Sequence, residues 1–220
     1  MENKNIFITG GGSGIGGELT DILAKNNNLL ITFFKSKKNI FYLTKNYSKN
    51  ITSKKVNFNK KSEIIKSANI IKKKFKNIDT VIFNALIPTK RKKFTSTSIN
   101  EIENNLKKNF LSNVLYTKEL IKIIKKQKNL CLFVHISSNV AKYGGWGLSN
   151  YAPIKAANDN FFRGIEKEFF RKIKFISIKL GPVKTKGYIF TNAKISKNIL
   201  DKKEAAKKII SIINKNSYKI

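Results

Sequence analysis

Short apolar runs recur along this chain at spacings that leave room for a helix between them. Five runs fit buried strands, at residues 6–8 (IFI), 29–34 (LLITFF), 80–84 (TVIFN), 130–136 (LCLFVHI) and 175–180 (FISIKL). A sixth run, at 54–58, is weaker. The strong runs are apolar almost throughout instead of alternating with polar residues, which predicts strands covered on both faces of a sheet.

Longer segments between these runs have helical periodicity. The predicted helices span 15–26, 62–76, 99–128, 151–171 and 201–215. Strands that alternate with helices predict βαβ units and a parallel sheet. We therefore predict an α/β fold with a doubly wound, Rossmann-like parallel sheet, in a single domain over residues 1–220.

The charge of the chain is extreme, with 45 Lys+Arg against 13 Asp+Glu and a net charge of +32. Such a charge is typical of nucleic-acid binders. However, only Arg91, Arg163 and Arg171 are arginine, the residue favoured for reading bases. Lys, Asn, Ile and Phe are abundant together, and all four have A/T-rich codons. The charge therefore indicates composition bias more than a specific nucleic-acid partner, although weak binding to polyanions at low salt is expected.

The cysteine count, the N-terminal residues and the lengths of the apolar runs indicate the cellular compartment. A single Cys131, inside an apolar run, excludes a disulfide framework within the chain and fits a reducing compartment. The N-terminus passes directly into KNIFITG, without a leader pattern, and no apolar run reaches the roughly 18 residues of a membrane span. We expect a cytoplasmic protein without a membrane or metal partner.

The first chemical motif is TGGGSGIG, at residues 9–16. It follows the first predicted strand and opens the first predicted helix. Glycines there let the backbone turn tightly and approach a pyrophosphate, while the helix N-terminus offers free N–H groups to that anion. A glycine turn without a ligand is the alternative. The position between strand and helix favours dinucleotide binding.

A second motif pairs Tyr151 with Lys155, four residues apart and hence on one face of a helix. A phenol has a pKa of about 10 and donates protons poorly near neutrality. A lysine ammonium beside it would lower that pKa. The pair therefore indicates general acid or base chemistry at Tyr151.

Taken together, these motifs resemble the short-chain dehydrogenase/reductase family. The nucleotide motif matches from Thr9 to Gly16, and the active-site tyrosine and lysine match Tyr151 and Lys155. The resemblance implies Ser138 as the residue that holds the substrate oxygen and Asn109 as support for a water-linked proton path. It implies the following cofactor-binding residues: Thr9, Gly10, Gly12, Ser13, Gly14, Ile15, Gly16, Lys35, Ser36, Asn57, Phe58, Asn84, Ala85, Tyr151, Lys155, Pro182, Val183 and Thr185.

The choice between NADP and NAD depends on the end of the second predicted strand. A carboxylate there would bind the ribose 2′-hydroxyl and repel a 2′-phosphate. The sequence reads FFKSKK, with Lys35 and Ser36 and no acid, which favours NADP over NAD. Asn57 stands where the family usually has an aspartate near adenine.

The implied activity is reduction of a carbonyl to an alcohol, or the reverse, with a nicotinamide cofactor. An acyl-chain ketone and a sugar or polyol both stay open as substrates. The segment after Thr185 is short and the sequence ends at NSYKI, so we expect a reduced substrate lid and a truncated or absent final strand. The family resemblance implies a homodimer or homotetramer. The alternatives are a non-catalytic nucleotide-binding regulatory or scaffold protein and a basic nucleic-acid-associated protein.

Overall fold

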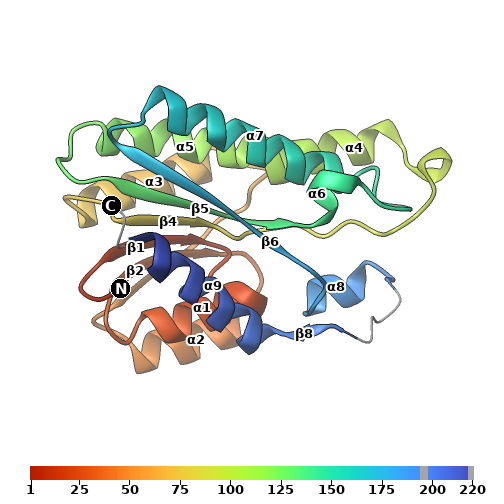
Figure 1. Ribbon diagram of the computed structural model, residues 1–220. Coiled ribbons are helices and arrows are strands. Elements are labelled where there is room, and N and C mark those ends of the chain that lie inside the picture. Colours follow the sequence, from red (N-terminus) through yellow and green to blue (C-terminus); the bar gives the residue numbers. More distant parts are fainter. Residues whose placement is uncertain (194–197, 218–220) are drawn as a thin grey trace.

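A six-stranded parallel sheet forms the centre of the computed structural model, which describes residues 1–193 and 198–217 (Figure 1). Its strands are β1 (Asn5–Thr9), β2 (Asn28–Phe33), β3 (Ile51–Lys55), β4 (Thr80–Phe83), β5 (Cys131–Ser138) and β6 (Ile173–Leu180). The strand order is β3-β2-β1-β4-β5-β6, and every neighbouring pair is parallel. The order reverses beside β1, where open α/β sheets bind ligands outside the strand ends. The predicted fold class is confirmed.

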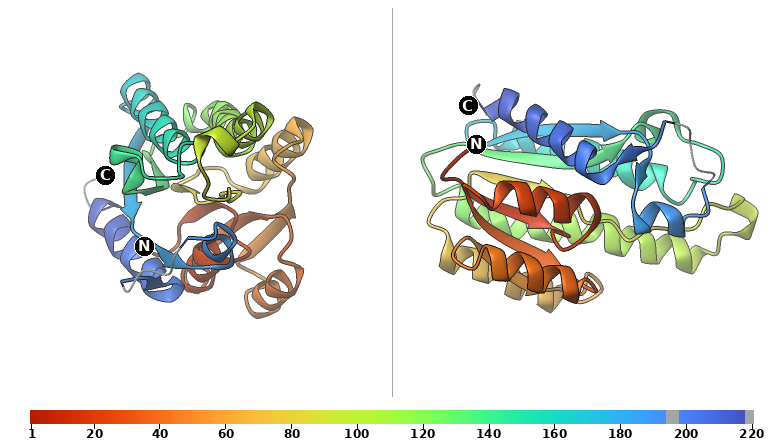
Figure 2. Two further views of the ribbon diagram at one scale, coloured as in Figure 1. Left: turned by 90° about the vertical axis from the view of Figure 1, so that its right-hand side faces the viewer. Right: turned by 90° about the horizontal axis from the view of Figure 1, so that it is seen from below.

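Helices cover both faces of the sheet (Figure 2). One face carries α1 (Gly14–Leu23), α2 (Lys37–Asn46) and α9 (Lys202–Ser217), and the other carries α3 (Lys61–Lys74), α5 (Ser112–Ile124) and α7 (Ala152–Glu168). The central strands β1, β2, β4 and β5 are largely apolar and buried, as expected for strands that are covered on both faces.

Shorter elements gather at the carboxyl ends of the strands, on the right of Figure 1. They are η1 (Phe94–Ser96), α4 (Ile99–Leu106), the π-helical turn η2 (Lys107–Leu111), α6 (Val140–Tyr143), α8 (Lys186–Phe190) and the paired strands β7 (Val183–Lys184) and β8 (Leu200–Asp201). These elements surround the edge of the sheet at which the sequence motifs meet.

The core lies in two layers, one on each face of the sheet. The layer under α1 and α9 is aliphatic and includes Leu19 and Ile209. The opposite layer is aromatic and centres on Phe162 of α7, whose ring lies 4.4 Å from that of Phe83 and 5.4 Å from that of Phe175. Aromatic side chains bury large areas, so this layer fixes α7 firmly on the sheet.

Three features differ from the sequence-based prediction. The weak strand predicted at 54–58 lies at Ile51–Lys55, where it pairs with β2 as the polar edge strand. Helix α2 was missed because only two of its side chains, Ile40 and Leu43, are buried. The long helix predicted at 99–128 is divided by the π-helical turn and ends at Ile124.

No helix within the described ranges is both long and apolar enough to cross a membrane.

Candidate active site

The turn between β1 and α1 depends on glycine at specific positions. Gly10 and Gly14 have φ angles of +69° and +56°, which side chains with a Cβ rarely adopt. A Cβ on Gly16 would lie 2.2 Å from the carbonyl oxygen of Gly10. The turn therefore brings two stretches of backbone closer together than any other residue would allow.

Polar side chains from two strands hold this turn in place. The hydroxyl of Thr9 accepts the backbone N–H groups of Asn84 and Ala85, each at 3.1 Å. The side-chain amide of Asn84 donates to the carbonyl oxygens of Thr9 (3.1 Å) and Gly10 (3.2 Å). Three of the predicted cofactor residues thus form the support of the turn, which ties the end of β1 to the end of β4.

The start of α1 has the features of an anion site. The N–H groups of its first turn, at Gly14, Ile15 and Gly16, have no carbonyl partner within the helix. Ser13 caps the helix without a side-chain hydrogen bond to it, so its hydroxyl can serve a ligand. A pyrophosphate fits this donor set, because N–H groups and the helix dipole both favour negative charge. Gly12 contributes its carbonyl oxygen to a hydrogen bond from Asn39 instead.

The segment after β6 passes over this anion site. The methyl group of Thr185 would lie 3.6 Å from a Cβ on Gly14. Thr185 caps α8 by accepting the N–H of Tyr188. Pro182 accepts the N–H of Leu200, and Val183 pairs with the same residue. The predicted residue Thr185 therefore lies beside the glycine turn, whereas the backbones of Pro182 and Val183 contact Leu200 of β8.

The residues predicted to bind the adenosine end of the cofactor differ in exposure and in their contacts. Lys35 is exposed just beyond β2, and Ser36 begins α2 without a side-chain cap bond. The Asn57 side chain accepts the N–H of Asn59 at 3.0 Å through Oδ1. Phe58 packs its ring against Tyr116, 5.9 Å away, so its side chain belongs to the core.

Ser138 and Tyr151 meet at the carboxyl edge of the sheet. Ser138 is the last residue of β5, and Tyr151 is the N-cap of α7. Their hydroxyl groups lie close enough for Ser138 to lower the pKa of Tyr151. Pro153 lies in the first turn of α7, where its missing N–H would have no helical partner. The spacing of thirteen residues therefore brings two hydroxyl groups together.

The electrostatics of Tyr151 differ from the expectation. Burial raises the pKa of Tyr151 above its usual value, and the hydrogen bond with Ser138 lowers it only in part. Contrary to the sequence-based expectation, Lys155 does not contribute to the shift in this pKa. The reason is that Lys155 points into the sheet, where its Nζ donates to the carbonyl oxygen of Ile136 at 2.6 Å.

Lys155 is itself unusual, because only 5% of the residue is exposed. Burial lowers the pKa of its ammonium group to about 8, and the charge of Asp159 opposes this effect. An amine with such a pKa changes its charge close to physiological pH, as functional lysines often do.

Asn109 lies in the π-helical turn η2, a type of irregularity that is frequent at functional sites. Its amide pairs in both directions with the backbone of Ile87, accepting the N–H at 2.8 Å and donating to the carbonyl oxygen at 2.9 Å. Its own carbonyl oxygen accepts the side-chain amide of Asn158 on α7, at 3.0 Å. Asn109 is therefore fixed against the helix that carries Tyr151 and Lys155, but it does not contact either of these side chains through a hydrogen bond.

Sequence reasoning missed the polar residues beneath this site. Asp159 is buried one helical turn after Lys155 and binds the buried His135 of β5. Asn158 bonds Asn113 on α5 at 2.8 Å. The available signal was the position of Asp159, four residues after Lys155 and thus on the same helix face.

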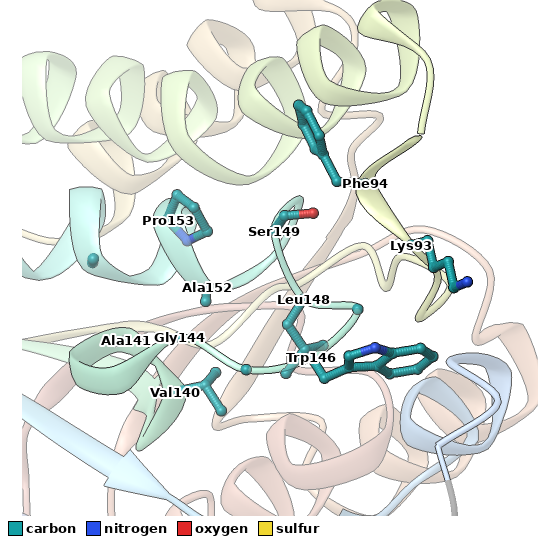
Figure 3. Close-up of a pocket in the computed structure, with 13 residues that line it drawn as sticks. Lys93, Phe94, Val140, Ala141, Gly144, Trp146, Leu148, Ser149, Ala152 and Pro153 are labelled. Carbon is teal, nitrogen blue, oxygen red and sulfur yellow. The ribbon is translucent and has the colours of Figure 1, made fainter. Parts of the chain in front are cut away.

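A hollow of about 450 Å³ opens on the outer side of the α7 N-terminus. Figure 3 shows Phe94 and Trp146 on different sides of it, contributed by the β4–α4 and α6–α7 connections. Val140, Ala152 and Pro153 complete the part next to α7. Ser138, Tyr151 and Lys155 do not line it, so this hollow is separate from the paired hydroxyl groups.

Within residues 1–193 and 198–217, no group of three or more His, Cys, Asp or Glu side chains is placed to hold a metal ion.

Several solved structures share this arrangement of strands and helices. No curated protein matches the chain. Among solved structures, levodione reductase superposes with a TM-score of 0.85 at 20% identity, covering 99% of this chain and 93% of its own. The 3-ketoacyl-(acyl-carrier-protein) reductase from Brucella melitensis, complexed with NADH, gives 0.83 at 19% identity, with 94% and 88% covered. A tyrosine-to-phenylalanine variant of ElxO with NADPH bound gives 0.82 at 24% identity, with 94% and 90% covered.

The structural likeness shows the shared fold, and the sequence match is more specific. Residues 4–195 match the family model described as short chain dehydrogenase. That range contains the glycine turn, Ser138, Tyr151 and Lys155. The chain therefore belongs to the short-chain dehydrogenase family of oxidoreductases.

Proposed function

We propose that this protein reduces a small carbonyl compound to an alcohol, or catalyses the reverse reaction, by hydride transfer with a nicotinamide cofactor and with Tyr151 as general acid or base. The observation that carries the proposal is the proximity of the Ser138 and Tyr151 hydroxyl groups, one helical turn from Lys155. This pair can hold and protonate a single substrate oxygen.

The protein supplies the proton chemistry. In reduction, Tyr151 donates its phenolic proton to the substrate oxygen while Ser138 donates a hydrogen bond to the same atom. In oxidation, Tyr151 accepts the proton. Because burial raises the pKa of Tyr151, the phenol is protonated at neutral pH and can donate its proton. The bound cofactor supplies or accepts the hydride. Positive charge near the phenol stabilises the phenolate that forms.

Lys155 and Asn109 complete the proposed site. Lys155 is the cation nearest in sequence on the helix face of Tyr151, and we place it against the cofactor ribose and the proton path. Asn109, fixed by Ile87 and Asn158, lines the same path. Each of these roles follows the family resemblance and is supported by burial of both side chains.

We further propose NADP as the cofactor in preference to NAD. The pyrophosphate would bind the N–H groups at Gly14, Ile15 and Gly16 and the hydroxyl of Ser13. At the ribose end, the absence of a carboxylate after β2 supports the choice, with Lys35 and Ser36 available to a 2′-phosphate. The structures of two relatives hold NADH and NADPH respectively, so both cofactors occur on this fold.

The adenine end would involve the backbone at Phe58 and the amide of Asn57. Oδ1 of Asn57 already accepts the N–H of Asn59, which leaves the Nδ2 donor for the base. The amide group donates a hydrogen bond and is neutral, whereas the carboxylate that the family usually has there accepts hydrogen bonds and is negative.

The substrate class stays open between acyl-chain ketones and sugars or polyols, which the names of the similar structures also span. We propose a cytoplasmic homodimer or homotetramer without a specific nucleic-acid partner. A non-catalytic nucleotide-binding regulatory or scaffold protein is the alternative, and it is opposed by the intact Ser138–Tyr151 pair.

A carbonyl-substrate screen followed by NADPH absorbance tests the proposal. Oxidation of NADPH that depends on a carbonyl and is lost in Tyr151→Phe would support it. Nucleotide binding without turnover on any member of a panel of ketones, aldehydes and sugars would favour the scaffold alternative instead.

A further inference from the structure

A buried carboxylate lies beneath the active-site helix. Asp159 is only 3% exposed and accepts three hydrogen bonds. The donors are Nδ1–H of His135 at 2.7 Å, Oγ–H of Ser137 at 2.8 Å and Oγ–H of Ser177 at 2.7 Å. The cluster joins α7 to β5 and β6, directly below the end of the sheet where Ser138 meets Tyr151.

None of the three donors cancels the charge of Asp159. Burial lowers the pKa of His135 to about 4, so its ring is neutral at neutral pH and donates from Nδ1. The two serines are neutral as well. Burial raises the pKa of Asp159, but the hydrogen bonds from His135, Ser177 and Ser137 leave it below its usual value. The cluster therefore holds one negative charge at neutral pH.

The group that this charge can serve is the Lys155 ammonium, one helical turn away on the same face of α7. Lys155 is also buried, and its hydrogen-bond acceptor, the carbonyl oxygen of Ile136, is neutral. A buried cation without an opposite charge is costly and tends to lose its proton. Asp159 provides the opposite charge.

Other groups around the pair do not replace Asp159. The ionisable or polar side chains that face it are Tyr151 on α7, His135, Ser137 and Ser138 on β5, Ser177 and the exposed Lys179 on β6, and the amides of Asn109 and Asn113 on the η2–α5 segment. At neutral pH these are neutral or, for Lys179, positive. Asp159 is thus the acidic group of this set.

We propose that Asp159 is a positioning residue for Lys155: its carboxylate, held by His135, Ser137 and Ser177, keeps the Lys155 amine in the ammonium form at neutral pH. The importance of that ammonium for catalysis rests on the proposed oxidoreductase function. The electrostatic relation itself does not, and it can be measured without nucleotide or substrate.

The experiment measures the pKa of individual lysines by competitive trace acetylation over a pH series, with peptides quantified by mass spectrometry. The exposed Lys167, also on α7, is the internal reference. Asp159→Asn removes the charge and keeps the shape, whereas Ser177→Ala removes one hydrogen bond and keeps the charge. The exchange Asp159→Ser/Ser177→Asp moves the carboxylate across a 2.7 Å hydrogen bond, onto β6.

In Asp159→Asn the midpoint for Lys155 should fall by about one pH unit, the lower end of the effect of a nearby opposite charge on a buried group. Ser177→Ala should leave it near the parent value, and the exchange variant should restore much of the shift. Asp159→Ser provides a second charge removal if Asp159→Asn does not fold. A Lys155 midpoint unchanged in a folded variant that lacks the Asp159 carboxylate would overturn the proposal.

Turnover separates this proposal from the broader one. If the protein is an oxidoreductase, the alkaline limb of its pH profile should move in Asp159→Asn by the same amount as the labelling midpoint, and Ser177→Ala should leave the limb in place. A shifted midpoint in a protein that turns over no carbonyl would support the role of Asp159 and contradict the oxidoreductase function.

Discussion

Gly16→Ala offers a sharp test of the glycine turn at which we propose that the nucleotide binds. The added Cβ would lie 2.2 Å from the Gly10 carbonyl oxygen, 3.0 Å from its carbonyl carbon and 2.4 Å from Nδ2 of Asn84. A carbon and an oxygen in ordinary contact need about 1 Å more than the shortest of these distances. Two of the three atoms are backbone, so side-chain rotation cannot relieve the clash.

Overpacking of this kind costs typically about 1–3 kcal/mol. For a domain of this size, each kcal/mol changes the melting temperature by about 2–4 °C, so Tm should fall by about 2–12 °C. Separation of α1 from Gly10 should also displace the N–H groups proposed for the pyrophosphate. We therefore expect nucleotide affinity to fall together with Tm.

Gly164→Ala is the matched control, because a Cβ on Gly164 of α7 meets no atom within 4 Å. Alanine is favoured over glycine inside a helix by about 0.5–1 kcal/mol, so this variant should melt slightly above the parent. Thermal unfolding by circular dichroism and calorimetry with NADPH provide the two readouts. A Gly16→Ala protein that melts at or above the parent temperature and binds nucleotide normally would refute the reasoning.

Four further outcomes are expected. Tyr151→Phe should keep cofactor binding and reduce turnover by roughly a hundredfold or more, and Ser138→Ala should mainly reduce turnover; parent rates in Tyr151→Phe would exclude it as the acid. NADPH should bind more tightly than NADH by calorimetry, and Lys35→Asp should narrow or reverse that preference, whereas tighter NADH binding by the parent would count against NADP. Burial lowers the pKa of His135, the sole histidine, to about 4 in the folded protein, against about 6.5 in the unfolded chain. The free energy of unfolding should therefore decrease by about 3 kcal/mol as the pH falls from about 6.5 to about 4. His135→Asn should flatten this slope in denaturant titrations, and an unchanged slope would show that another group dominates. Binding to DNA should be independent of sequence and fade toward physiological salt in gel-shift titrations, unlike that of a specific DNA-binding protein.

Local chemistry was sufficient for much of this protein. The glycine motif predicted a strand, a tight turn and a helix, because glycine alone tolerates the φ angles at Gly10 and Gly14. Apolar runs predicted the buried strands and the doubly wound fold, because a strand covered on both faces has no polar side to show. The spacing of Tyr151 and Lys155 predicted their shared helix face. All of these depend on residues close together in sequence.

The tertiary structure decided what depends on residues far apart in the chain. Helix α2 has few apolar positions and is defined by docking Ile40 and Leu43 on the sheet. The Lys155 ammonium is held by the Ile136 carbonyl oxygen on β5, and burial raises the pKa of Tyr151 where the sequence predicted a lower one. The carboxylate of Asp159 meets its three donors only because β5, β6 and α7 converge at one point. Burial and long-range hydrogen bonds determine these charges, and neither can be read from the spacing of residues along a sequence.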